Sequence, residues 1–138
     1  MNWREYHMGF AEHAKLKSKD PTTQVGAAAI GPLNQIVETG FNGLPRGVED
    51  RPERMERPTK YLYTSHAEEN LVATAARARL DGTTVYVTHL CCSRCARMLI
   101  QAGVSKVVAG DGVTSMPKEE FDAAIEMFNE AGVKLEYV

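Results

Sequence analysis

The sequence predicts an α/β fold, a three-layer sandwich in which helices cover both faces of a mixed β-sheet. Three observations lead to this prediction. A helical stretch at the start is followed by two short β-rich runs that can form a hairpin. Helical and β-rich segments then alternate to the end of the chain, which is typical of strands joined by crossover helices. The 138 residues suit one hydrophobic core, so we expect a single domain over residues 1–138.

The first helix and the hairpin precede residue 44. Residues 2–17 carry apolar side chains at helical spacing, and Asn2 with Glu5 has the spacing of a reciprocal N-terminal cap. Two runs with β-branched residues follow at 24–31 and 35–43, separated by Pro32, Leu33 and Asn34. We therefore expect one helix and then two paired strands.

A long irregular segment covers residues 44–65. It contains three prolines and nine charged residues and shows no periodicity. Loops of this length inside a domain are usually functional. The run "RPERMERPTK" within it is most simply a solvated loop, although a lid over a ligand or a subunit contact is an alternative.

Helices and strands alternate through the rest of the chain. The Ala-rich stretch 66–80 predicts a helix that ends at Asp81 and Gly82. Further along, we expect strands at 83–89, 105–110 and 133–138, with a helix at 93–103 and a last helix that begins near Pro117.

Composition limits the classes of partner. The chain has 16 basic and 18 acidic residues, and its formal charge of −2 gives no general attraction to nucleic acid. No segment has the pattern of a signal peptide or of a membrane span, so we expect a cytoplasmic protein. In a reducing compartment, three clustered cysteines favour metal binding or catalysis over disulfides.

Two short motifs stand at the starts of successive helices. His66 and Glu68 open one helix, and Cys92 and Cys95 open the next. Helices that follow neighbouring strands on one face of a sheet begin close together, so one histidine and two cysteines can meet at a single ion. Three protein ligands with a fourth position left open are the pattern of a catalytic zinc site. The sequence therefore predicts zinc bound by His66, Cys92 and Cys95.

Glu68 is the candidate proton carrier beside this metal. Two residues of helix rotate by about 200°, but in a first turn both side chains can reach over the helix end. The pattern H-x-E followed by P-C-x-x-C is the known signature of zinc nucleobase deaminases. Here Cys91 occupies the proline position, which leaves two registers open, Cys92 with Cys95 or Cys91 with Cys95. We favour the first because its two-residue spacer lets both thiolates face one ion.

Four stretches resemble the cytidine and deoxycytidylate deaminase superfamily, and most closely its deoxycytidylate deaminases. They are "SKDPTTQVGAAAIG", "GFNGLPRGVED", "HAEENLV" and "YVTHLCCSRCARMLIQAGVSKVV", in family order. The resemblance implies a five-stranded sheet and hydrolysis of dCMP to dUMP and ammonia, which supplies dUMP for thymidylate synthesis. It also implies that water activated by zinc and Glu68 attacks C4 of cytosine, and that the enzyme is a homo-oligomer, a hexamer or trimer.

The resemblance and the charge pattern also suggest substrate contacts. Asn42 matches an asparagine that binds the sugar in related deaminases. Lys19, Arg46 and Arg94 are our candidates for the phosphate, since a phosphate needs cations and arginine can bind it through two hydrogen bonds. His89 either packs over the pyrimidine ring, as aromatic residues do in relatives, or is a strand-end histidine hydrogen-bonded for stability.

Regulated members of the family bind effectors near the corresponding loop. There the motif "GYNG" contributes to a site for the activator dCTP and the inhibitor dTTP, and a triphosphate of this kind can bring Mg²⁺. Here the motif reads "GFNG", without the phenolic hydroxyl, and comprises Gly40, Phe41, Asn42 and Gly43. Glu69 is treated as structural or as part of this effector site, because it rotates about 100° away from Glu68.

Two alternatives remain open. The same chemistry could act on 5-methyl-dCMP, 5-hydroxymethyl-dCMP, dCTP or a base in nucleic acid, although the net charge favours a free nucleotide. The chain could instead be a catalytically silent zinc-stabilised binding module. That second alternative predicts a fourth protein ligand, supplied by Cys91 or His89, that closes the site.

Overall fold

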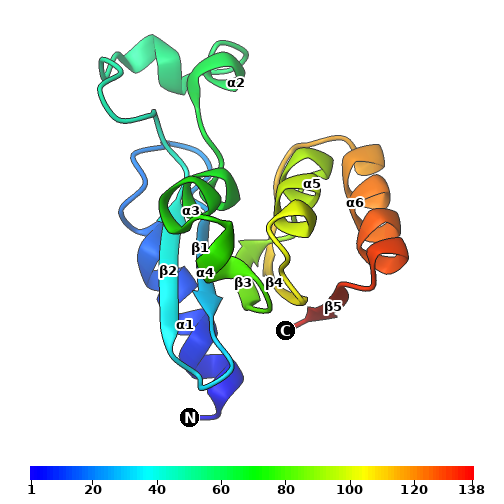
Figure 1. Ribbon diagram of the computed structural model, residues 1–138. Coiled ribbons are helices and arrows are strands. Elements are labelled where there is room, and N and C mark those ends of the chain that lie inside the picture. Colours follow the sequence, from blue (N-terminus) through cyan, green and yellow to red (C-terminus); the bar gives the residue numbers. More distant parts are fainter.

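A mixed five-stranded sheet forms the centre of the computed structural model, which describes residues 1–138 (Figure 1). The strand order is β2-β1-β3-β4-β5. Strand β1 runs antiparallel to both its neighbours, whereas β3, β4 and β5 run parallel to one another. The strands are β1 (Gly26–Ile30), β2 (Ile36–Phe41), β3 (Thr84–His89), β4 (Lys106–Gly112) and β5 (Lys134–Tyr137). The predicted α/β class with a mixed five-stranded sheet is confirmed.

Helices cover both faces of the sheet, but unequally. The first face is covered by α1 (Trp3–Lys15), against which Ala28 and Ile30 of β1 are buried. The alternate residues Ala27 and Ala29 face the larger core on the other side. That core is built with α3 (Ala67–Ala75), α5 (Ser93–Gln101) and α6 (Lys118–Ala131). None of the helices is both long and apolar enough to cross a membrane.

The first helix begins where its sequence predicts. The Asn2 side-chain oxygen accepts a hydrogen bond from the Glu5 amide at 2.8 Å, and the Glu5 carboxylate accepts one from the Asn2 amide at 3.2 Å. These two bonds satisfy backbone donors that the first turn of a helix leaves free. The reciprocal cap therefore sets the start of α1.

Strand directions bring several loops to one end of the sheet. Because β1 is antiparallel to β2 and β3, its first residue, Gly26, pairs with Phe41 at the end of β2 and lies near the end of β3. His89 at the end of β3 pairs with Gly112 at the end of β4. The segment that precedes β1 and the segments that follow β2, β3 and β4 therefore meet at the same end of the sheet.

Two expectations about helices are corrected. The predicted helix over 66–80 breaks at Ala76, whose φ of 67° lies in the left-handed region, and continues as α4 (Arg77–Leu80). A contact distant in sequence accompanies this break, since the Arg77 side chain donates to the Gln101 carbonyl at 3.0 Å. An Ala-rich sequence carries no local signal for such a turn.

The segment 44–64, which we call the arm, is not wholly irregular. It contains a 3₁₀ turn, η1 (Pro52–Met55), and a short helix, α2 (Lys60–Tyr63). The antiparallel bridge between Gly43 and Ser65 closes its base. Figure 1 shows the arm projecting away from the sheet, with α2 at its far end.

Candidate active site

Three potential metal ligands meet where α3 and α5 begin. His66 immediately precedes α3, and Cys92 immediately precedes α5, which carries Cys95 in its first turn. The Nδ1 atom of His66 lies 3.2 Å from Sγ of Cys95 and 3.5 Å from Sγ of Cys92. All three donor atoms lie within 4.8 Å of one another.

This cluster has the chemistry and the spacing that zinc requires. Zinc–sulfur bonds of about 2.3 Å and zinc–nitrogen bonds of about 2.0 Å, at tetrahedral angles, separate nitrogen from sulfur by about 3.5 Å. The two sulfur–nitrogen distances in the cluster are close to that value. Neither Cys91 nor His89 belongs to the cluster, so three protein donors are present and the fourth ligand that a closed structural site needs is not.

The two thiols of the cluster hold protons unequally. The Cys95 thiol donates a hydrogen bond to Cys92, and together with a bond from His66 this outweighs burial and lowers the pKa of Cys92 to about 4. The pKa of Cys95 is raised for the same reason, because its proton is the one shared with the Cys92 sulfur. Metal binding therefore has one thiolate available near neutral pH and has to displace the shared proton.

Glu68 lies beside the cluster and is almost fully buried. Its side chain is buried, and burial raises the pKa of its carboxyl even though the neighbouring His66 opposes the shift. Burial also raises the pKa of the Cys91 thiol well above its ordinary value, and the carboxyl of Glu68 adds to that shift. Cys91 therefore remains a protonated thiol against Glu68. A raised pKa makes the carboxyl hold a proton more readily than a free glutamate does, which suits a group that carries a proton.

Glu69 and Arg94 connect the two helices that carry the cluster. The Glu69 carboxylate accepts a hydrogen bond from the His66 amide at 2.8 Å and thereby caps α3. The same oxygen accepts one from Arg94 at 3.0 Å, and Nη2 of Arg94 lies 3.4 Å from Nε2 of His66. Glu69 and Arg94 therefore stabilise the helix starts that carry the cluster.

A single cavity joins the cluster to the arm. Its empty space of about 730 Å³ includes space that is open to solvent. His66, Glu68 and Cys92 line its inner part. The arm contributes Arg57, Lys60, Tyr61 and Thr64, and the segment after β4 contributes Thr114, Ser115 and Met116.

Asn42 lines this cavity, but most of its amide is already used. Its oxygen accepts a hydrogen bond from the Val25 amide at 2.9 Å, and its nitrogen donates to the Thr23 carbonyl at 2.9 Å. These bonds orient the side chain and leave one N–H of the amide unassigned. Asn42 is therefore held rigidly with one donor remaining.

His89 lines the cavity as well. A β-carbon at Gly112 would lie 2.5 Å from three atoms of the His89 ring, so the glycine is what allows the ring to pack against β4. The Thr88 hydroxyl accepts a hydrogen bond from the Gly26 amide and lies within hydrogen-bond distance of Nδ1 of His89, at 2.7 Å. Burial lowers the pKa of His89, and Lys15 lowers it further. The ring is accordingly neutral.

The structure does not bring Lys19, Arg46 or Arg94 into the cavity wall. Lys19 is exposed and forms an ion pair of 2.8 Å with Asp50, and Arg46 is exposed in the arm. Gly40 has a packing function, because a β-carbon there would lie 2.5 Å from the Ala67 carbonyl at the start of α3. Phe41 is partly exposed, and Gly43 forms the bridge that closes the arm.

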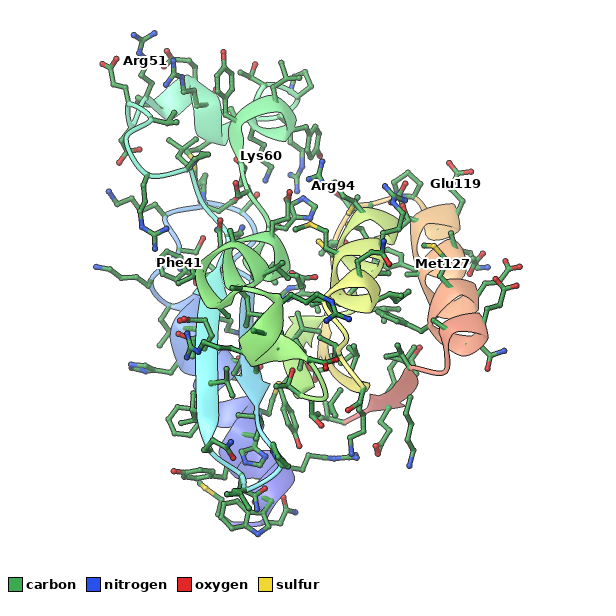
Figure 2. The ribbon with its side chains drawn as sticks, viewed as in Figure 1. Phe41, Arg51, Lys60, Arg94, Glu119 and Met127 are labelled. Carbon is green, nitrogen blue, oxygen red and sulfur yellow. The ribbon has the colours of Figure 1, made fainter.

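Sequence reasoning missed a buried ion pair in the cavity wall. The Lys60 ammonium lies 3.1 Å from the Asp20 carboxylate and 3.1 Å from the Thr22 hydroxyl, and the Lys60 and Asp20 side chains are only 7% and 2% exposed. Figure 2 shows Lys60 directed from α2 towards the body of the protein. In the sequence, only the position of Lys60 six residues before His66 indicates that it could lie near the site.

Comparison with known proteins places the chain in a family of deaminases. Residues 1–111 match the profile of the family described as cytidine and deoxycytidylate deaminase zinc-binding region. A deaminase of the luxG 3′ region of Aliivibrio fischeri is 41% identical over 99% of this chain and 93% of that protein. Deoxycytidylate deaminase of Mus musculus is 37% identical over 96% of this chain and 78% of its own. The crystal structure of cyanophage S-TIM5 dCMP deaminase with dCMP and dUMP has a TM-score of 0.75 at 25% identity, over 98% of this chain and 96% of that chain.

Proposed function

The chain belongs to the cytidine and deoxycytidylate deaminase family and is a deaminase, and on that basis we propose that it hydrolyses dCMP to dUMP and ammonia. One observation carries the proposal: the cluster of His66, Cys92 and Cys95 stands, beside the buried Glu68, at the wall of a cavity that is open to solvent. The mouse relative named deoxycytidylate deaminase and the phage structure that contains dCMP and dUMP support this choice of substrate.

Each side chain of the cluster has a distinct part in the proposed reaction. His66, Cys92 and Cys95 hold zinc, which when bound supplies a Lewis acid that lowers the pKa of water. Glu68 accepts a proton from the water that attacks C4 of the cytosine. As the C4–N bond breaks, Glu68 returns the proton to the departing amino group, and ammonia leaves. The raised pKa of Glu68 suits both transfers.

The neutral residues of the cavity orient the substrate. His89 is uncharged and packed against Gly112, so it offers an aromatic surface without a competing charge. Asn42 offers one amide N–H to the sugar, in an orientation set by its bonds to the segment 23–25. Neither residue exchanges a proton in this proposal.

We extend the proposal to regulation and assembly as the resemblance implies. Activation by dCTP, inhibition by dTTP with Mg²⁺, a homo-oligomer and a cytoplasmic location remain predictions from the sequence. Gly40 packs against the start of α3, and Glu69 caps that helix. An effector site near the base of the arm would therefore use other residues. Rates with and without each triphosphate, together with light scattering for mass, test these points.

Ammonia release from dCMP tests the proposed activity. The zinc-loaded protein should convert dCMP, whereas the Glu68→Gln variant should bind the same amount of zinc and turn over about 10² to 10⁴ times more slowly. The same assay with 5-methyl-dCMP, 5-hydroxymethyl-dCMP and dCTP identifies any preferred nucleotide. If the Glu68→Gln variant kept the wild-type rate, the assignment of the proton carrier would be wrong.

A further inference from the structure

We propose that Arg57, at the outer end of the cavity, binds the phosphate of the nucleotide substrate, with the Thr64 and Thr114 hydroxyls completing the polar wall. This inference rests on the proposed function, because it assumes that the ligand is a nucleoside monophosphate. It assigns specificity for the phosphorylated substrate to a residue of the arm. None of the cations suggested by sequence pattern lines the cavity.

Two positively charged residues face the cavity. Among lysines and arginines, only Arg57 and Lys60 line it. Lys60 is buried and already bound to the Asp20 carboxylate and the Thr22 hydroxyl. Withdrawing it from that pair would leave Asp20 as a buried unpaired carboxylate, which is costly. Lys60 is therefore committed to the protein, and Arg57 is the cation available to a ligand.

The guanidinium of Arg57 is largely unpaired within the protein. Its Nε donates to the Tyr61 hydroxyl at 2.8 Å, and this is its only hydrogen bond within the protein. Both Nη groups consequently remain free to donate. Two parallel N–H donors match two oxygens of a phosphate, and the bond to Tyr61 fixes the plane of the guanidinium.

Two threonines of the cavity wall have unpaired hydroxyls. Thr64 and Thr114 line the cavity, and their hydroxyl oxygens are buried and have no hydrogen-bond partner. Buried hydroxyls without a partner are unusual in native proteins, because each forfeits its hydrogen bonds to water. One lies in the arm and the other follows β4, so they belong to two separate segments of the wall. A polar ligand in this part of the cavity would satisfy both.

The position of the cluster fixes which end of the nucleotide lies near Arg57. Glu68 is buried at the inner part of the cavity, where the cytosine has to lie to react. Arg57 is exposed on the arm. A mononucleotide with its base at Glu68 therefore directs its sugar and phosphate towards the arm.

Binding of dUMP and of deoxyuridine to the zinc-loaded protein tests the inference without turnover. Isothermal titration calorimetry should give a Kd for dUMP that is about 10- to 100-fold weaker in Arg57→Gln than in the wild type. The Kd for deoxyuridine should change less than about twofold. Arg57→Lys should lie between the two proteins, because it keeps the charge and loses the second hydrogen bond.

Arg51→Gln is the matched control. Arg51 lies on the same arm, pairs with Glu49 at 2.7 Å and does not line the cavity (Figure 2). This variant should bind dUMP like the wild type. Thr64→Val should weaken dUMP binding about 3- to 10-fold without lowering the thermal midpoint, because valine removes an unpaired hydroxyl and keeps the shape.

Three results would overturn the inference. They are an unchanged Kd for dUMP in Arg57→Gln, an equal loss of affinity for dUMP and deoxyuridine, and a wild type that binds both ligands equally. An unchanged Kd for dUMP in Thr64→Val would remove that hydroxyl from the site. Failure of the wild type to release ammonia from dCMP is a separate result that contradicts the proposed function. The binding of dUMP can still be measured and interpreted in that case, because it needs no turnover.

Discussion

The two ends of the cavity are built in different ways. At the inner end, the cluster is fixed by the starts of α3 and α5, and most of its members are buried in the larger core. At the outer end, the arm projects from the sheet, carries mostly exposed charged residues and is anchored through the buried Lys60. The core therefore positions the cluster, whereas the specificity that we propose for Arg57 depends on a peripheral segment.

The residues at the inner end can be predicted from the sequence, whereas those at the outer end require the tertiary structure. The inner residues lie within three positions of one another in two motifs, so local spacing and one contact between helices suffice to assemble them. The outer residues depend on contacts of high sequence separation, such as Lys60 with Asp20, forty residues apart. The two ends should also respond differently to substitution.

Loss of a metal ligand should have the largest effect. Cys92→Ser removes a thiolate whose pKa is lowered to about 4, so we expect loss of zinc and of all measurable deamination. Metal analysis and the ammonia assay measure both. Cys91→Pro is the matched control, since the Cys91 thiol lies outside the cluster and should leave zinc and activity intact. Zinc loss in Cys91→Pro together with retained zinc in Cys92→Ser would reverse our choice of register.

Breaking the buried ion pair of the arm should mainly reduce stability. Lys60→Met leaves the Asp20 carboxylate buried without its counter-charge, and we expect the free energy of unfolding to fall by about 3–5 kcal/mol. Urea unfolding at pH 7 measures this. Lys19→Met breaks an exposed pair with Asp50 and should give no measurable change. A similar small effect in both variants would mean that the arm is not anchored through Lys60.

Acid should weaken the same anchor, with a smaller effect. Burial alone would raise the pKa of Asp20, but the amides of Thr23 and Thr22 and the Lys60 ammonium outweigh it and lower that pKa. The resulting stability is fully present above the ordinary aspartate pKa of about 3.9 and is lost as pH falls through the lower folded value.

Unfolding free energies of the wild type and Asp20→Asn between pH 3 and 7 check this dependence. The difference between the two proteins should be constant above about pH 5 and should shrink towards the acid end. A difference that stayed constant down to pH 3 would show that Asp20 contributes through shape and not through charge.

Much of the fold followed from local patterns. The alternation of helical and β-rich segments after a hairpin predicted the mixed sheet. The spacing of Asn2 and Glu5 predicted the reciprocal cap at the start of α1. The break at Ala76 and the helix α2 were missed. Both are stabilised by contacts with distant segments, which no local propensity encodes.

The sequence by itself determined the family, the sheet and which residues could meet at a metal, because histidine, glutamate and cysteine at fixed spacing at helix starts leave few arrangements. Only the tertiary structure decided which cations face the cavity. Lys19 and Lys60 are both lysines, and no local pattern tells them apart. In the structure the exposed Lys19 pairs with Asp50, whereas the buried Lys60 pairs with Asp20. A charge acquires its partner, and with it its availability to a ligand, only when the chain has folded around it.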